Sequence, residues 1–134
     1  MHGSGVSPGY LVGRRLERLV ASWHRHGTDP RSGPLDVWLI DSASVATHVT
    51  MGSDWCLILE RSDPFPGYDM GDSGRVEVGP VSTETPFAAH LGETIEAVNQ
   101  AAEPGIGRTV LDVVFESGCV RCDGWSGDLR LTAR

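Results

Sequence analysis

The chain of 134 residues contains no lysine, and all 11 of its basic residues are arginines. This absence excludes Schiff-base chemistry at a lysine, a phosphate-binding loop with its lysine, and a Ser–Lys dyad. The chain also has no apolar run of the roughly 18 residues that cross a bilayer, and its Gly/Ser-rich start lacks the apolar segment of a secretory signal. We expect a flexible tail over residues 1–10, a single domain over residues 11–134 and a cytoplasmic location.

Cysteine is scarce, and two of the three cysteines form a lone Cys-x-x-Cys motif at Cys119 and Cys122. Zinc sites usually need two such pairs, or one pair with two suitably spaced histidines. If this segment is a strand, the two thiols point to opposite faces and cannot share one metal. We therefore expect three reduced cysteines, no metal and no cofactor.

Positive charge is in the minority, and the formal net charge is −7. Such a balance does not favour a nucleic-acid partner, because phosphate binding needs a basic surface. The charge is uneven: residues 1–34 carry five arginines and two acids, a net of +3, whereas residues 35–134 carry six arginines and sixteen acids, a net of −10. Two interpretations stay open, a basic helix lying along an acidic body or an acidic body that meets a basic protein partner. A homodimer is also left open, and we expect no membrane partner.

Residues 11–26 (LVGRRLERLVASWHRH) have the periodicity of an amphipathic helix. Apolar residues follow the spacing i, i+4, i+7, i+8 and i+11 at Val12, Leu16, Leu19, Val20 and Trp23. Arg14 and Arg18 fall on the opposite side, and Gly27 supplies a stop. We expect the apolar face to be buried and the two arginines to be exposed.

The rest of the chain favours strands, which are short apolar runs bounded by turn residues. The expected strands are residues 36–41, 45–50, 54–60, 75–78, 109–116, 119–122 and 128–133. Residues 87–91 favour one helical turn, and residues 93–100 fit a strand or a helix. The predicted fold is α+β, with an N-terminal amphipathic helix packed on a five- to seven-stranded, mainly antiparallel sheet; a partly closed barrel is the alternative.

Two segments are similar to parts of chymotrypsin-like serine proteases: Gly71–Gly74 (GDSG) to the nucleophile segment and Ala88–His90 (AAH) to the histidine segment. That mechanism brings Ser, His and Asp together across two barrels. This chain is too short for two barrels, the histidine follows the serine, and Arg75 stands where a further glycine belongs. We interpret residues 71–74 as a glycine-rich turn and assign no catalytic residue.

Two groups of residues are candidates for a functional site. A ligand pocket with aromatic walls and a few polar groups would use Trp38, His48, Trp55, Arg121 and Trp125. A protein-binding surface in the loop of residues 61–74 would use Phe65, Tyr68, Asp69 and Asp72. The loop aromatics also fit a loop folded over an edge of the core, and the last tryptophan also fits a cap on the end of the sheet.

Several short segments, in a fixed order, carry a resemblance to known proteins. They are residues 54–60 (DWCLILE), 75–78 (RVEV), 86–87 (PF), 92–95 (GETI), 113–118 (VVFESG), 124–125 (GW) and 128–131 (DLRL). Together they make residues 36–132 resemble a group of small actinobacterial domains of unknown function whose layout is similar to that of immunity proteins. The group has no agreed activity, so the resemblance implies no catalytic residue.

Charge, size and the lack of a convergent catalytic set predict an acidic, non-catalytic protein-binding domain of the immunity or inhibitor kind. The alternative is a small enzyme or ligand-binding protein of a secondary-metabolite pathway, with the aromatic pocket as its site.

Overall fold

A computed structural model describes residues 8–27, 34–52, 56–81, 85–105, 107–125 and 128–134. Within these ranges the chain forms ten strands and three 3-10 helices. The elements in chain order are η1 (Pro8–Leu11), β1 (Leu16–Arg25), β2 (Asp36–Asp41), β3 (Ala46–Met51), β4 (Leu57–Arg61), β5 (Tyr68–Asp69), η2 (Gly71–Ser73), β6 (Arg75–Pro80), η3 (Pro86–His90), β7 (Ile95–Glu103), β8 (Gly107–Phe115), β9 (Gly118–Trp125) and β10 (Asp128–Ala133).

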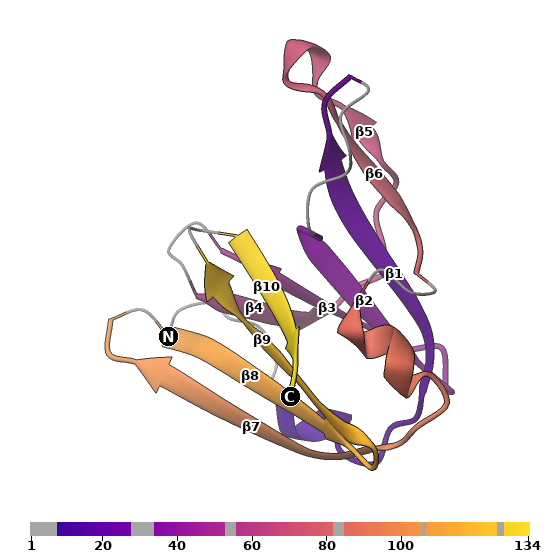
Figure 1. Ribbon diagram of the computed structural model, residues 1–134, viewed down its shortest axis with the longest axis vertical. Coiled ribbons are helices and arrows are strands. Elements are labelled where there is room, and N and C mark those ends of the chain that lie inside the picture. The colour runs from indigo at the N-terminus through magenta and orange to yellow at the C-terminus, as the bar shows by residue number, and fades with distance from the viewer. Residues whose placement is uncertain (1–7, 28–33, 53–55, 82–84, 106, 126–127) are drawn as a thin grey trace.

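The strands divide into two antiparallel sheets that pack as two layers (Figure 1). One sheet has six strands in the order β4-β3-β2-β1-β6-β5, and the other has four in the order β10-β9-β8-β7. The short η3 contacts β1, β9 and β10 and so lies between the layers. The fold is therefore two stacked sheets rather than one partly closed barrel.

The main core fills the space between the two sheets. Alternate residues of β8 point into it, and Leu111, Val113 and Phe115 are at most 2% exposed. They belong to the same buried cluster as Val37 and Leu39 of β2. Because each fully buried side chain of this size contributes about 1.5–3 kcal/mol, this layer is the main source of stability.

The prediction of an α+β fold with an N-terminal helix is wrong. Strands account for 61% of the described residues and helices for about 11%, and the described part contains no helix of seven residues or more. Consequently none of the described helices has the length and apolar character needed to cross a membrane.

The segment predicted as a helix is mostly the longest strand, β1. Leu16, Leu19 and Trp23 are buried, as expected, but Val12 is 48% exposed. The register against β2 shifts at the start of β1, where two exposed residues, Glu17 and Arg18, follow Leu16. This β-bulge adds one residue, so two inward positions are three apart instead of two, which imitates a helical spacing.

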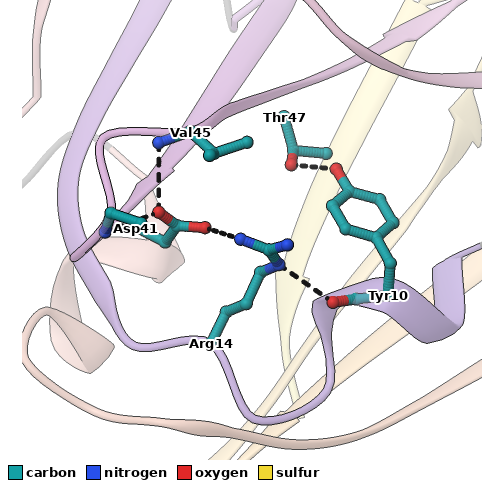
Figure 2. A network of polar contacts seen from close by, with 6 residues as sticks. Tyr10, Arg14, Asp41, Val45 and Thr47 are labelled. Atoms are coloured by element: carbon teal, nitrogen blue, oxygen red, sulfur yellow. Dashed lines mark hydrogen bonds and ion pairs between the residues drawn. The ribbon is translucent and has the colours of Figure 1, made fainter.

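The segment before β1 is held by polar contacts rather than by a helix face (Figure 2). The Arg14 guanidinium donates to the Asp41 carboxylate at 2.5 Å and to the Tyr10 carbonyl at 3.0 Å. The Tyr10 hydroxyl meets the hydroxyl of Thr47, and Asp41 also accepts the backbone N–H of Val45 at 3.0 Å. These contacts fix η1, which includes three residues assigned to the predicted tail, against the β2–β3 hairpin.

One end of the six-stranded sheet projects beyond the four-stranded sheet, with η2 at its tip (Figure 1). We call residues 23–26 and 67–78 the arm. Gly74 has φ +95°, and a Cβ at this position would lie 2.4 Å from the Arg25 carbonyl oxygen. His24 and His26 donate from Nε2 to the carbonyls of Ser73 and Asp72, at 2.6 and 2.9 Å. The tip is thus held against β1 by close backbone contact and two histidine hydrogen bonds.

Candidate functional site

A row of four rings, Trp38, His48, Phe65 and Tyr68, lies on the six-stranded sheet, on the face that points away from the main core. Trp38 and His48 are cross-strand partners on β2 and β3, and their rings stack with centroids 4.7 Å apart. Phe65, from the loop between β4 and β5, meets Trp38 edge-on at 5.0 Å and lies 6.1 Å from Tyr68. This aromatic row joins two residues of the predicted pocket to two of the predicted partner surface.

Exposure increases along the aromatic row. Trp38 has no exposed surface, His48 is 8% exposed, and Tyr68 is 52% exposed. The indole Nε1 of Trp38 is buried and has no hydrogen-bond partner among the described residues. Stacking on His48 and edge-on contact with Phe65, rather than a hydrogen bond of the indole, therefore orient this ring.

Both ring nitrogens of His48 face carboxylates. Its Nε2 lies 2.6 Å from Asp36 Oδ1 and its Nδ1 lies 3.3 Å from Glu60 Oε1. The other oxygen of Asp36 accepts the hydroxyl of Ser22 at 2.5 Å. The network ties four neighbouring strands together, because Ser22, Asp36, His48 and Glu60 come from β1, β2, β3 and β4.

The network shifts the ionisation of its members toward the charged forms. Burial alone would lower the pKa of His48, but its bonds to Asp36 and Glu60 raise that pKa above the ordinary value of 6.5. Burial alone would raise the pKa of Asp36, but the hydrogen bonds from His48 and two hydroxyl groups lower it below 3.8. Both shifts therefore favour the imidazolium–carboxylate form of the pair over the neutral forms.

The order of groups in this network does not suit covalent catalysis. A nucleophilic serine needs its hydroxyl on the histidine, with the acid on the far side of the ring. Here Ser22 bonds to Asp36, and both nitrogens of His48 already face acids. Within the described ranges, no three His, Cys, Asp or Glu side chains are arranged to hold a metal ion.

The arm presents an exposed apolar surface edged by acids. Tyr68 and Met70 are 52% and 43% exposed, and Asp69 and Asp72 are exposed beside them. A groove of about 520 Å³ lies next to Tyr68 and is lined by residues 67–69 and 75–78. All four residues predicted for partner binding therefore lie on the arm or in the loop that leads to it.

The acidic side chains of the arm differ in whether they form ion pairs with arginines. Glu77 is paired with both Arg25, at 3.8 Å, and Arg75, at 3.0 Å. Asp69 accepts the backbone N–H of Gly71 at 2.7 Å, and neither it nor Asp72 has an arginine partner in the described part of the chain. Within the arm, the acids without an ion pair are therefore the two nearest its tip.

Of the other predicted pocket residues, Arg121 is described, and it lies away from this site. Arg121 lies on the outer face of the four-stranded sheet, where it makes a bidentate pair with Asp112 at 2.8 and 3.0 Å. That face is on the opposite side of the molecule from Trp38 and His48, since both sheets turn their inner faces to the same core. Trp55 and the side chain of Trp125 lie outside the described part.

A second polar cluster, unforeseen from the sequence, joins η3 to the β8–β9 turn. Glu93 accepts the hydroxyl of Ser117 at 2.7 Å and its backbone N–H at 3.2 Å. His90, stacked on Phe115 at 4.4 Å, approaches both Glu93 and Ser117 through the same nitrogen, Nδ1. Because the histidine does not stand between serine and acid, the cluster ties two segments together rather than forming a triad. Ser73, the serine of the protease-like segment, lies elsewhere, at the tip of the arm.

The sequence carried a partial signal for the His48 network. Asp36 and Trp38 are two apart on a strand, so they share a face, and a hairpin pairs that strand with the one bearing His48. To predict that Ser22 and Glu60 join the network, one must also know the order of the strands in the sheet, and no local sequence pattern gives that order.

Comparisons with known proteins found no matching family model, no matching curated protein and no matching solved structure. The resemblance to small actinobacterial domains stays a prediction. The function is therefore argued from the geometry of the aromatic row and the arm.

Proposed function

We propose that this chain is a non-catalytic, acidic protein-binding domain that acts in the cytoplasm in the manner of an immunity or inhibitor protein. The observation that carries the proposal is the exposure of Tyr68 and Met70, 52% and 43%, on a projecting arm. Large apolar side chains flanked by charges are typical of protein interfaces, in which tyrosine is enriched at the energetic centre.

The charge of the arm indicates a basic partner. Asp69 and Asp72 form no ion pair with a described arginine, although Arg75 is the cross-strand partner of Asp69. Residues 35–134 have a net charge of −10. Such a field attracts a basic surface and sets its orientation on approach.

The polar clusters support a binding role over catalysis. In both clusters the serine hydroxyl donates to a carboxylate, Ser22 to Asp36 and Ser117 to Glu93. A serine held this way is not activated, because its proton is not directed to a base that can carry it to a leaving group.

The test compares two double charge reversals with the same net charge. Asp69→Arg with Asp72→Arg alters the arm, and Glu103→Arg with Glu116→Arg alters exposed acids of the four-stranded sheet. A partner captured from the native host is titrated with each variant at two salt concentrations. We expect the first variant to lose at least ten-fold in affinity, about 1.4 kcal/mol, and the second to lose much less. Affinity for the wild type should fall with salt, because screening shortens to about 8 Å at physiological ionic strength.

Equal losses for the two variants would show that net charge, not the arm, attracts the partner, and would refute the assigned surface. Circular dichroism of each variant checks that the fold is retained.

A ligand-binding function is the second candidate, and the groove beside Tyr68 favours it. Its volume of about 520 Å³ falls in the range of small-molecule sites, roughly 300–1,000 Å³. A metabolite that raises the melting temperature of the wild type, but not of Tyr68→Ala, would support this candidate over a protein partner.

A further inference from the structure

His48 connects the interior of the six-stranded sheet to the loop that leads into the arm. Its ring stacks on Trp38 of the neighbouring strand, and Phe65 is roughly perpendicular to it, with the two ring centroids 6.3 Å apart. Phe65 is followed within three residues by Tyr68, the most exposed ring of the aromatic row. The position of Phe65 thus affects where the arm begins.

The hydrogen bonds of His48 require a charged ring. A carboxylate only accepts hydrogen bonds, and both nitrogens of His48 face carboxylate oxygens, at 2.6 and 3.3 Å. An imidazolium donates from both nitrogens, whereas a neutral imidazole has one lone pair that would face a carboxylate. Loss of the proton must therefore break one of the two contacts.

The contact that breaks is the one to Glu60. Asp36 is 2.6 Å from the ring and is held by Ser22, whereas Glu60 is 3.3 Å away with its side chain 49% exposed to water. Glu60 is also the last but one residue of β4, and the loop that carries Phe65 follows directly. Releasing Glu60 frees the origin of that loop.

Loss of the proton also weakens the stack. A cationic ring is attracted to the face of an indole, and this attraction disappears when the ring becomes neutral. The indole Nε1 of Trp38 has no hydrogen-bond partner in the described part of the chain, so the stack on His48 is one of the contacts that orient this ring.

We propose that His48 is a pH-sensitive latch for the arm: the imidazolium holds Phe65 and the chain leading to Tyr68 on the sheet, and loss of its proton releases them. This proposal takes one point from the proposed function, namely that the arm is the surface to which the partner binds. Partner binding then weakens as the pH rises, because the groove beside Tyr68 is formed by the held state.

The groups that face His48 are consistent with this direction. Asp36 from β2 and Glu60 from β4 are the charged groups in contact with it, and neither has an arginine partner among the described residues. β1 contributes the hydroxyl of Ser22 through Asp36, and the loop contributes Phe65. Two anions around one ring favour its protonated form.

The arm is connected to the network by a second route as well. Ser22, which donates to Asp36, is the cross-strand partner of Val78 in β6. Val78 lines the groove together with Gly67, where a Cβ would lie 2.6 Å from the carbonyl oxygen of Val76. The loop therefore lies directly on the strand that the network supports.

Fluorine NMR of the full chain labelled with 4-fluorophenylalanine tests the latch without any partner. The chain has three phenylalanines: Phe65 reports the latch, Phe87 lies in the main core, and Phe115 stacks on His90. Over about pH 5 to pH 9, which spans histidine ionisation, we expect the Phe65 resonance to shift with a midpoint above 6.5. The Cε1 proton of His48 should show the same midpoint, and the Phe87 resonance should stay constant.

Variants assign the effect to His48. His48→Gln should abolish the titration of Phe65, while His90→Gln should leave it unchanged. Glu60→Gln keeps the ring and alters a half-exposed side chain, so it should fold, and it should lower the Phe65 and His48 midpoints together. Glu116→Gln, an exposed acid on the β8–β9 turn, is the matched control and should move neither.

A Phe65 resonance that stays constant while His48 titrates would overturn the latch, as would a titration that survives in His48→Gln. If His48→Gln does not fold, Glu60→Gln decides, and midpoints that move separately would refute the proposal. Neither result bears on whether the arm binds a partner, so the two proposals fail independently.

Discussion

Trp23 and Val12 separate the observed strand from the expected helix at the level of single side chains. Both belong to the apolar face of the predicted helix, but Trp23 is 3% exposed and Val12 is 48% exposed. We expect Trp23→Ala to lower the free energy of unfolding by about 3–5 kcal/mol, because it empties a large volume between the sheets. Val12→Ala should change it by less than about 0.5 kcal/mol. Urea denaturation followed by circular dichroism measures both, and similar losses would restore the helical interpretation.

Glu93 makes stability sensitive to acid. The hydrogen bond from the Ser117 hydroxyl lowers the pKa of this carboxyl below 4.5, against a smaller opposing effect of burial. A lowered pKa contributes stability that is present above the unfolded-state value and is lost as the pH falls through the folded-state value. Glu93→Gln should therefore be less stable than the wild type at neutral pH, and the difference should shrink below about pH 4. Thermal melting across this range checks the sign.

Ser117→Ala separates the contributions of the two hydrogen bonds that Glu93 accepts from Ser117. It removes the hydroxyl but keeps the backbone N–H that Glu93 also accepts. Its loss of stability at neutral pH should be smaller than that of Glu93→Gln. A difference from the wild type that grows toward low pH would contradict the role assigned to the carboxylate.

Among the elements, the tip of the arm depends on one glycine. Gly74 combines φ +95° with a Cβ position 2.4 Å from a backbone oxygen of β1. Backbone strain of this kind costs of order 1–3 kcal/mol, and the close contact would also push η2 away from β1. We expect Gly74→Ala to destabilise the protein by about 1–3 kcal/mol in urea denaturation.

Gly79→Ala in β6, the strand that follows Gly74, is the control for this prediction. Gly79 has no positive φ, and a Cβ there would meet no atom within 4 Å. The substitution should be neutral or slightly stabilising. Equal losses at the two glycines would show that the contact with Arg25 does not hold the tip.

The sequence predicted some elements well and one wrongly, for identifiable reasons. The expected strands at residues 36–41 and 128–133 have the bounds of β2 and β10, because each is a short run closed by turn residues. β1 was predicted as a helix because its bulge separates Leu16 from Leu19 by three residues, after which Ala21 and Trp23 follow at the strand period of two. A bulge is fixed by pairing with another strand, so it is not visible in a local pattern.

The candidate site was predictable in its parts but not as a whole. The aromatics Phe65 and Tyr68 stood out as unusual in an acidic loop, and Trp38 and His48 as pocket residues. Their union into one row depends on β2, β3 and the loop sharing one side of the sheet. Arg121 belongs to the other sheet for the same topological reason.

At the scale of the whole molecule, acidic residues lie on both sheets. On the four-stranded sheet, Asp112 and Asp123 form bidentate pairs with Arg121 and Arg130, at 2.8 to 3.0 Å. Exposed pairs of this kind add little stability, and Glu96, Glu103 and Asp128 are exposed on the same sheet. Negative charge is therefore present on both sheets, and the arm is distinguished by acids that lie beside the exposed Tyr68 and Met70.

The reactivity of Cys119 and Cys122 toward a thiol reagent can show whether the two sheets have come apart. None of the three forms a disulfide, and Cys122 has no exposed surface while Cys119, on the same strand β9, is partly exposed. Burial raises the pKa of both thiols, and only the thiolate reacts. A thiol reagent should therefore label Cys119 in the folded protein, and Cys122 only in molecules whose sheets have come apart.

In single-cysteine variants, the rate of labelling at Cys122 should follow the unfolding equilibrium when refolding is fast compared with the reaction. A Trp23→Ala background that loses about 3–5 kcal/mol should speed labelling of Cys122 by roughly a hundred-fold or more, because each 1.4 kcal/mol is about a factor of ten. The same background should leave labelling of Cys119 nearly unchanged, and Val12→Ala should affect neither. Stopped-flow or mass-spectrometric labelling gives both rates. If Cys122 reacts as fast as Cys119 in the folded wild type, the two sheets do not enclose it, and the packing of the four-stranded sheet on the six-stranded sheet is wrong.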